Sequence, residues 1–225
     1  MINYTIHFYL QRMEELEMNI IILGAFGHLG KAVYQLLEPL PNVNLTLFGR
    51  EKENIEVAST TKVIFGDATN PEDLEDALRG QDVVFSTLGP FHVETFAKPL
   101  VETMEKLDVT RLFWTTQFQI RQDEVTEENI ALAKTFGFDE EMERTYVANQ
   151  KLGAQIIEDS SLDYTLLMPH FFKYDNSIAK VILQDEDETV EGEPISIYSL
   201  ALGLVYLLLR PELYSKKGVI ISAAE

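Results

Sequence analysis

The stretch IILGAFGHLGKAV, residues 21–33, places glycines at every third position: Gly24, Gly27 and Gly30. An apolar run typical of a buried strand precedes the first glycine, and a helix-like run begins at His28. A loop between them has to turn tightly and let backbone N–H groups approach a pyrophosphate, which glycine allows because it has no Cβ. The stretch predicts a dinucleotide-binding loop, and a glycine turn without a ligand is the alternative. The predicted contacts comprise the glycines and the residues between them, Phe26, His28 and Leu29.

Strand-like and helix-like segments alternate along the chain. Six short runs rich in β-branched and aromatic residues have the composition of buried parallel strands: 19–23, 44–48, 62–65, 82–88, 111–116 and 163–168. Longer amphipathic segments lie among them, at 28–38, 71–80, 93–107 and 149–160. This alternation predicts an α/β fold with a doubly wound, mostly parallel sheet and helices on both of its faces.

The alternation loosens after Pro169. The acidic run Asp185–Glu188 and Gly192 predict an exposed loop. A last helix over residues 198–209 and a short strand at 218–222 are expected to close the fold.

We expect one Rossmann-type domain over residues 18–225, in which residues 169–225 build a small substrate-side lobe. Residues 1–17 precede the first predicted strand. They are expected to be an N-terminal extension, either a loosely docked helix or a disordered segment that contributes nothing to the fold.

Composition narrows the functional classes. The 225 residues include 18 basic and 37 acidic ones, a net charge of −19, and no cysteine. Nucleic acids and anionic membranes need positive surface, so neither is expected as a partner. The longest apolar run, residues 200–209, is about half the roughly 20 residues of a membrane helix, so it predicts a buried helix. We expect a cytoplasmic protein, monomeric or homodimeric, that acts on a small molecule.

The end of the second predicted strand bears on cofactor choice. Many NAD-binding sites place an acidic residue there to accept from the ribose hydroxyls. Here Arg50 occupies the place, followed by Glu51. Arginine can stack on adenine and bind a 2′-phosphate through two hydrogen bonds, which favours NADP over NAD, although Glu51 weakens the argument.

Two further strand ends fit a dinucleotide. Asp67 follows the third strand, with Ala68 beside it, and is placed to accept from the adenine amino group. The small residues in STLG, residues 86–89, leave room for the ribose. The predicted contacts there are Thr87, Leu88 and Gly89.

These segments together resemble the atypical short-chain dehydrogenase/reductases, in the NmrA-like and biliverdin/flavin-reductase-like branch. The matching pieces are ILGAFGHLG (22–30), GDATNPEDLEDALRGQDVVFSTLG (66–89) and KLGAQIIEDSSLDYTLLMP (151–169). The resemblance implies a Rossmann-type core, NADP binding and a substrate pocket above the nicotinamide built by the C-terminal part.

Hydride-transferring members of that family use a Tyr and a Lys four residues apart on one helix, and a Ser after the fifth strand. Lys151 matches the lysine, which would also contact the cofactor, but Tyr146 stands five residues before it. Five residues separate two helical side chains by about 140° rather than about 40°, so the pair can meet only across a helix start or a bulge. Gln117 is the closest match to the serine. We take Tyr146, Lys151 and Gln117 as candidate catalytic residues of a degenerate triad.

The resemblance also implies a pocket for a flat substrate. The segment LLMPHFF, residues 166–172, resembles the one that borders this pocket in the family. An aromatic wall is therefore expected, although packing in the core is the alternative for each ring. Its candidates are Phe91, Trp114, Phe118, His170 and Phe171. The spacing of the histidines predicts no metal site.

Three functions stay open at this stage. An NADPH-dependent oxidoreductase would reduce a planar or carbonyl small molecule, such as a flavin or quinone. An NADP-binding redox sensor of the NmrA-like type would bind the cofactor without turnover, and the broken Tyr–Lys spacing favours it. A sugar-nucleotide epimerase is disfavoured, because such enzymes need an intact Tyr–Lys pair and a larger C-terminal domain.

Overall fold

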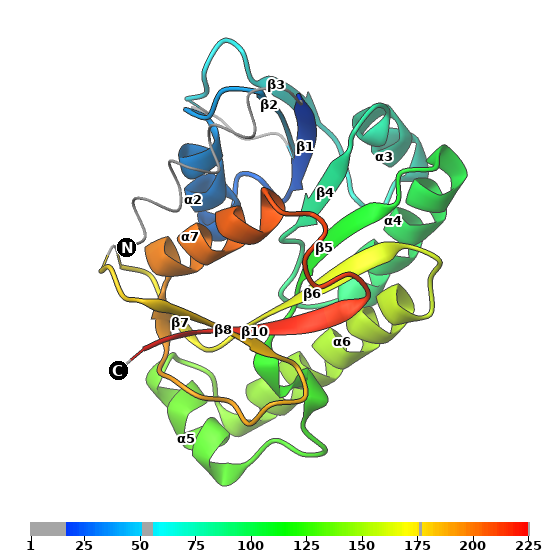
Figure 1. The fold of residues 1–225 in the computed structure, drawn as a ribbon. Coiled ribbons are helices and arrows are strands. Elements are labelled where there is room, and N and C mark those ends of the chain that lie inside the picture. The colour runs from blue at the N-terminus through cyan, green and yellow to red at the C-terminus, as the bar shows by residue number, and fades with distance from the viewer. Residues whose placement is uncertain (1–16, 51–55, 176, 225) are drawn as a thin grey trace.

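The computed structural model describes residues 17–50, 56–175 and 177–224. The six predicted runs form parallel strands: β1 (Met18–Leu23), β2 (Val43–Gly49), β3 (Lys62–Phe65), β4 (Val83–Ser86), β5 (Arg111–Thr115) and β6 (Asp163–Pro169). Two C-terminal strands extend them, β10 (Lys217–Ala223), parallel to β6, and β8 (Val181–Asp185), antiparallel to β10. The resulting eight-stranded sheet has the order β3-β2-β1-β4-β5-β6-β10-β8 (Figure 1). The predicted α/β fold with a mostly parallel sheet is confirmed.

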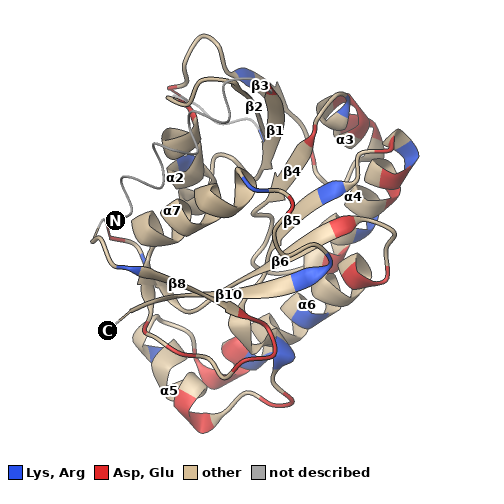
Figure 2. Cartoon of the chain, viewed as in Figure 1, with Lys and Arg blue, Asp and Glu red and all other residues tan. Residues whose placement is uncertain are grey.

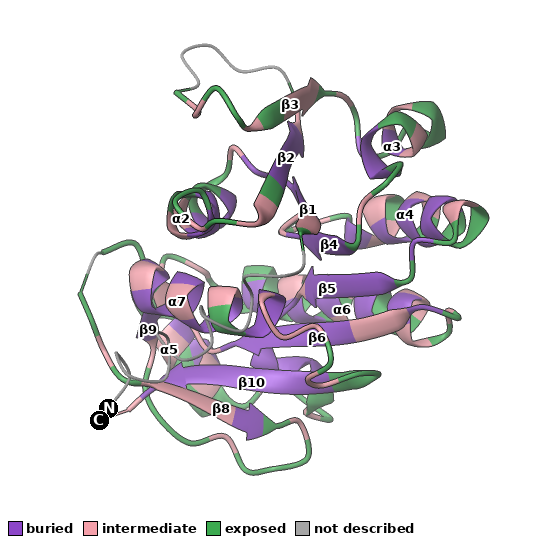
Figure 3. Cartoon of the chain, turned by 45° about the horizontal axis from the view of Figure 1, so that its top comes forward, coloured by how far each residue is buried: buried purple, intermediate pink, exposed green. Residues whose placement is uncertain are grey.

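Helices cover both faces of this sheet. One layer contains α2 (His28–Leu37) and α7 (Ile197–Leu208), and the other contains α3 (Pro71–Leu78), α4 (Val93–Leu107) and α6 (Glu140–Glu158) (Figures 1 and 3). Successive β1 side chains alternate between the layers, Ile20 toward α2 and α7, Ile21 toward the opposite core. Both faces of the strand are buried, which explains why its sequence is continuously apolar.

Smaller elements gather at the carboxyl edge of the sheet. η2 (Phe118–Arg121) and α5 (Glu127–Thr135) pack against α6. β7 (Phe172–Lys173) pairs with β9 (Ile195–Ser196). These elements surround the end of the sheet at which the glycine loop lies.

The predicted helices are present, and the start of one of them, α6, differs from the prediction. α4 has the predicted bounds, and Asn70 caps α3 by accepting from the Glu72 N–H at 3.0 Å. α6 is longer than expected and begins at Glu140 rather than at residue 149, capped by Asp139. This earlier start places Tyr146 inside the helix.

The C-terminal third contains the predicted last helix, as α7, and the predicted last strand, as β10. Residues 181–185 form the additional strand β8, because β10 offers a free edge for antiparallel pairing, so only Asp185 of the expected loop at Asp185–Glu188 and Gly192 belongs to a strand. Thus part of the segment 169–225, predicted as a substrate-side lobe, completes the central sheet and its α2-side helix layer. Of the predicted extension 1–17, residues 1–16 lie outside the described residues.

α7 is the buried helix predicted for the longest apolar run. It carries no charged residue, and its side chains pack against α2 and the sheet. Figure 2 shows the acidic residues concentrated instead on α3, α4, α5 and α6. Within the described ranges, no helix has both the length and the apolar character needed to cross a bilayer.

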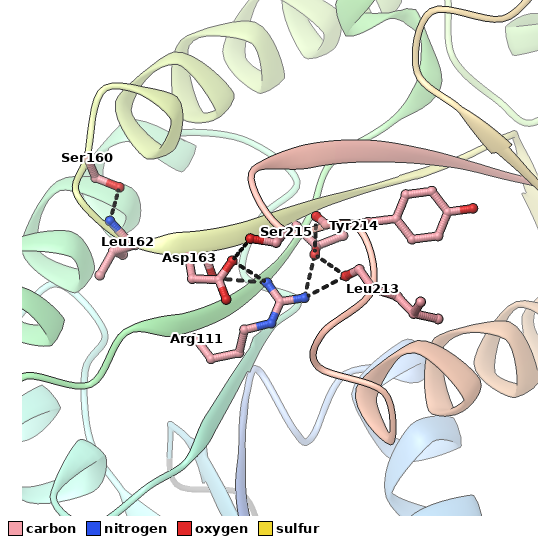
Figure 4. Close-up of polar contacts among 8 residues, drawn as sticks. Arg111, Ser160, Leu162, Asp163, Leu213, Tyr214 and Ser215 are labelled. Carbon is pink, nitrogen blue, oxygen red and sulfur yellow. Dashed lines mark hydrogen bonds and ion pairs between the residues drawn. The ribbon is translucent and has the colours of Figure 1, made fainter.

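A buried arginine organises the opposite, amino edge of the sheet (Figure 4). Arg111 is 6% exposed and donates to the carbonyl oxygens of Asp163 and Leu213, at 2.9 and 3.0 Å, and to Thr165 Oγ1 at 2.7 Å. The Asp163 carboxylate lies 3.6 Å from the guanidinium and accepts from Ser215 Oγ. Burial lowers the pKa of Arg111 to about 10, so it remains a cation at neutral pH. The network holds the connection between α7 and β10 far from the glycine loop.

Candidate functional site

The glycine loop is tightly packed where its first and third glycines lie. Gly24 has φ of +80°, a conformation that L side chains rarely adopt. A Cβ on Gly24 would lie 2.7 Å from Thr87 Oγ1, and one on Gly30 would lie 2.6 Å from the Gly24 carbonyl oxygen. The loop thus presents bare backbone at the end of β1.

The N-terminus of α2 has the features of an anion-binding site. Gly27 is its N-cap, and within the described part of the chain no side chain caps it and its first turn carries no acidic residue. By contrast, Asn70, Thr126, Asp139 and Ser196 cap α3, α5, α6 and α7. The Gly27 N–H already donates to the Gly24 carbonyl oxygen at 3.0 Å. The helix dipole and the N–H groups of the first turn, at His28 and Leu29, are suited to a pyrophosphate.

The ends of β2 and β3 lie side by side. Arg50 is exposed after β2, and its charge helps to lower the pKa of Asp67, after the larger effect of hydrogen bonds from Thr69. The Asp67 carboxylate accepts from both the N–H and Oγ1 of Thr69 at 2.8 Å, so it already forms a local turn. Ala68 is buried beside it, whereas Glu51 lies outside the described residues.

Phe26 links the glycine loop to these strand ends. Its ring lies against Gly49, where a Cβ would come within 2.9 Å of it, and 5.8 Å from the ring of Phe65. The side chain of Phe26 therefore packs between the glycine loop and β2. A contact between its backbone and a ligand would be additional to this packing.

A cavity of about 270 Å³ opens between the glycine loop and the ends of β4 and β5. It lies where the strand order reverses between β1 and β4, the place at which doubly wound sheets bind ligands. Its lining is Gly27, His28, Leu29, Thr87, Leu88, Gly89, Pro90, Thr115, Thr116, Tyr146, Gln150, Phe172 and Tyr174. Six predicted cofactor contacts therefore line one cavity: Gly27, His28, Leu29, Thr87, Leu88 and Gly89.

Unpaired polar atoms gather around this cavity. Thr115 Oγ1, Thr116 Oγ1 and Gln150 Oε1 are buried without a hydrogen-bond partner among the residues that the structure describes. Such atoms are rare in folded proteins, and a bound ligand or water usually satisfies them. The bare glycine loop and the uncapped α2 beside this cavity fit a dinucleotide.

The structure does not bring Lys151 and Tyr146 together. α6 runs without a break from Glu140 to Glu158, so neither a helix start nor a bulge compensates for their spacing of five residues. Tyr146 lines the cavity, whereas Lys151 Nζ donates to the carbonyl oxygen of Gln122. Gln150, four residues after Tyr146, stands where the family's lysine would stand. The four-residue spacing in the sequence indicates Gln150 as the residue beside Tyr146, whereas a comparison by residue type selects Lys151.

Gln117 is also placed differently from expectation. Its Oε1 accepts from the Gln119 N–H at 2.8 Å and caps η2, so its side chain is not part of the cavity lining. Thr115 and Thr116, from the same strand end, line the cavity instead. The hydroxyl groups at the end of β5 thus come from threonines.

Tyr146 has an apolar environment. The rings of Phe91 and Phe138 lie 6.0 and 5.7 Å from its own. Burial raises the pKa of its phenol, and the nearby carboxyl of Glu143 raises it further. No lysine or arginine is found in the described lining of the cavity. The phenol therefore stays protonated at neutral pH and can donate a hydrogen bond.

Most of the predicted aromatic wall packs on itself rather than on the cavity. His170 stacks on Phe118 at 4.5 Å, Phe171 contacts both rings, and Trp114 is fully buried in the core. Burial lowers the pKa of His170 to about 4, so it is neutral at pH 7. The rings that line the cavity with Tyr146 are Phe172 and Tyr174, which sequence reasoning missed.

Tyr174 reaches the glycine loop from the far side of the cavity. Its ring lies 5.0 Å from that of His28, at the start of α2, and 5.6 Å from Phe172. It is 70% exposed. The segment after β7 thus forms the outer wall of the site.

A family model described as NAD(P)H-binding matches residues 24–211. The chain belongs to this NAD(P)H-binding family. The membership agrees with the resemblance to atypical short-chain dehydrogenase/reductases, and it confirms the expectation of a nicotinamide cofactor. No protein of curated function matched the sequence. In the described residues, no group of three or more His, Asp or Glu side chains is arranged to hold a metal ion.

Solved structures show the same fold at low sequence identity. A Rossmann-fold NAD(P)-binding family protein from Shigella flexneri is 24% identical, with a TM-score of 0.74 over 92% of this chain and 94% of that one. A short-chain dehydrogenase/reductase from Veillonella parvula, in complex with NADP, is 18% identical, with a TM-score of 0.77 over 91% and 94%. An anaerobilin reductase from Escherichia coli O157:H7 is 17% identical, with a TM-score of 0.73 over 92% and 97%.

Proposed function

We propose that this protein is an NADPH-dependent oxidoreductase that reduces a planar or carbonyl small molecule. The observation that carries the proposal is the cavity itself, which Tyr146, a protonated phenol, lines together with the polar residues Thr115, Thr116 and Gln150 beside the glycine loop. Membership of the NAD(P)H-binding family supports the cofactor class.

The bound cofactor would supply a hydride. Around it, Thr115, Thr116 and Gln150 offer hydrogen-bonding atoms, and Phe172 and Tyr174 exclude water from one side. Tyr146 would donate a hydrogen bond to an oxygen of the substrate. Because its pKa is raised and no cation lines the described part of the cavity, Tyr146 polarises the substrate without giving up its proton. Flavins and quinones suit such a site, since water can protonate the reduced product.

We also propose NADPH rather than NADH as the reductant. Arg50 is exposed at the end of β2, where the adenosine ribose of a dinucleotide lies in this fold. The nearby Asp67 carboxylate follows β3 rather than β2, and its Oδ1 accepts both hydrogen bonds from Thr69.

A second candidate is an NADP-binding redox sensor without turnover. It is favoured by Gln150 in place of a lysine beside Tyr146, because the site then lacks a rapid proton relay. The anaerobilin reductase and the NADP complex among the structural neighbours favour the reductase.

Oxidation of NADPH with a panel of flavins, quinones and simple ketones tests the proposal, with NADH in parallel. Gly24→Ala is the matched control for non-enzymatic reduction, since its Cβ would meet Thr87 Oγ1 at 2.7 Å in a strained backbone. We expect turnover of at least one flavin or quinone that the control lacks. Tight NADPH binding with no oxidation across the panel would instead support the sensor.

A further inference from the structure

The cavity differs in charge between its two ends. The cofactor end has positive groups: the N-terminus of α2 with its helix dipole, Lys31 near the start of that helix, and Arg50 after β2. The opposite walls come from α6 and from the ends of β4, β5 and β7, and their described lining residues include no Asp, Glu, Lys or Arg. A substrate held there meets hydroxyl groups, an amide and aromatic rings, but among these residues no counter-ion for an anionic group.

Two lysines adjacent to lining residues are directed elsewhere. Lys151 follows Gln150 on α6, and its Nζ donates to the carbonyl oxygen of Gln122. Lys173 is exposed on β7 between Phe172 and Tyr174, which both line the cavity. Successive side chains of a strand point to opposite sides, so Lys173 points away from the cavity. Neither ammonium group therefore pairs with a substrate at this end.

Acidic residues lie on the two helices beside this end of the cavity (Figure 2). The first turns of α6 and of α5, which packs against it, carry carboxylates: Glu140, Glu141 and Glu143 on α6, and Glu127 and Glu128 on α5. Of these, Glu140 is paired with Arg144 at 2.9 Å. Burial raises the pKa of the Tyr146 phenol most, and the charge of Glu143 raises it further. The electrostatic field at the lining phenol is therefore negative.

We propose that the substrate of this site is a planar molecule without an anionic group, such as riboflavin or an uncharged quinone, and that the site discriminates against acceptors that carry a phosphate, sulfonate or carboxylate. The inference rests on the proposed function, because it names the substrate class of the same cavity. An anionic group would lose water beside aromatic rings without gaining a counter-ion. The acidic helices and the phosphates of bound NADPH would also repel it.

Two pairs of acceptors test the proposal. Riboflavin and FMN share the isoalloxazine ring and differ in one phosphate, and naphthoquinone and naphthoquinone sulfonate form a second pair. We would measure kcat/KM for each acceptor at saturating NADPH. Riboflavin should exceed FMN by about 10-fold or more, as expected for electrostatic repulsion at low salt. Raising the ionic strength from about 0.1 to 1 M should narrow the difference, because the Debye length falls from about 10 to 3 Å.

A matched pair of variants separates charge from shape. Tyr174 is 70% exposed on the outer wall, so its replacement is compatible with folding. Tyr174→Lys adds a cation there, whereas Tyr174→Gln removes the ring equally without adding charge. The FMN-to-riboflavin ratio of kcat/KM should be about 10-fold higher for Tyr174→Lys than for Tyr174→Gln. Glu102→Gln is the control for net charge, because Glu102 is exposed on α4, about 13 Å along the helix from its start. Its ratio should stay within about twofold of the wild type.

The outcomes distinguish this inference from the proposed function. Reduction of FMN as efficiently as riboflavin, or more so, overturns the inference and leaves the reductase standing. Equal ratios for Tyr174→Lys and Tyr174→Gln also overturn it, because charge in the cavity would then not select the substrate. A protein that binds NADPH but reduces neither member of either pair overturns the proposed function, and the inference with it.

Discussion

The packing of the glycine loop predicts the effect of a single methyl group at Gly30. Gly30 lies inside α2, and its φ is not in the left-handed region, so alanine is compatible with its backbone conformation. Helix propensity alone would make Gly30→Ala more stable by about 1 kcal/mol.

The tertiary contacts oppose this gain. The new Cβ would lie 2.6 Å from the Gly24 carbonyl oxygen and 2.8 and 3.0 Å from Cα and C of Ala25. These are backbone atoms, which cannot swing away as a side chain can. Overpacking costs about 1–3 kcal/mol, so we expect a net loss of roughly 0–2 kcal/mol and a Tm lower by up to about 8 °C.

The same displacement should weaken cofactor binding. If α2 moves away from the loop, at least one charged hydrogen bond to the pyrophosphate is lost, which is worth about 1.5–3 kcal/mol or roughly a 10- to 100-fold rise in Kd. Urea denaturation and NADPH titration measure the two effects. Gly203→Ala, in α7, is the control, because its Cβ would meet only side chains, Val181 Cγ1 at 3.0 Å being the nearest. A Gly30→Ala protein that is more stable than the wild type and binds NADPH equally well would refute the packing argument.

Three other outcomes follow from the site. Arg50→Asp should raise the Kd of NADPH about 10-fold or more and spare NADH, since only NADPH carries the 2′-phosphate, and equal losses would contradict the NADP assignment. Tyr146→Phe should leave turnover within a few-fold, because a phenol of raised pKa with no cation in the described cavity lining serves as a hydrogen-bond donor; a fall of about 10² or more would show proton transfer instead. His170 has its pKa lowered from 6.5 to about 4, so the folded state binds fewer protons than the unfolded state between those values. The contribution of His170 to the free energy of unfolding is therefore largest above about pH 6.5. It decreases by up to roughly 1.4 kcal/mol per pH unit as the pH falls toward 4. Urea denaturation at pH 7 and pH 5 should therefore show a larger decline for the wild type than for His170→Phe, and parallel declines would count against a buried neutral histidine.

Local signals in the sequence were sufficient for the nucleotide-binding half. The strand before Gly24, the glycine spacing and the helix from His28 are contiguous, so their interactions are encoded within a few residues. The same holds for Asn70 and the start of α3, where the capping side chain and the N–H that donates to it are two residues apart. Five of the six predicted strands were recognisable because both faces of a central parallel strand require apolar side chains, whereas β3 is an edge strand without a buried residue.

The tertiary structure decided what depended on distant partners. Residues 181–185 became a strand because β10 lies beside them, although β10 follows more than thirty positions later in the chain. Phe118, His170 and Phe171 pack on one another, an arrangement that composition alone leaves open. The face of α6 that lines the cavity depends on where the helix begins and on how it packs against α4 and β6. Gln150 and Lys151 are adjacent in the helix, so their side chains point about 100° apart. Gln150 lines the cavity, whereas Lys151 donates to the carbonyl oxygen of Gln122. The residue types in the sequence suggested the lysine, and the packing of α6 against α4 and β6 directs the glutamine toward the cavity.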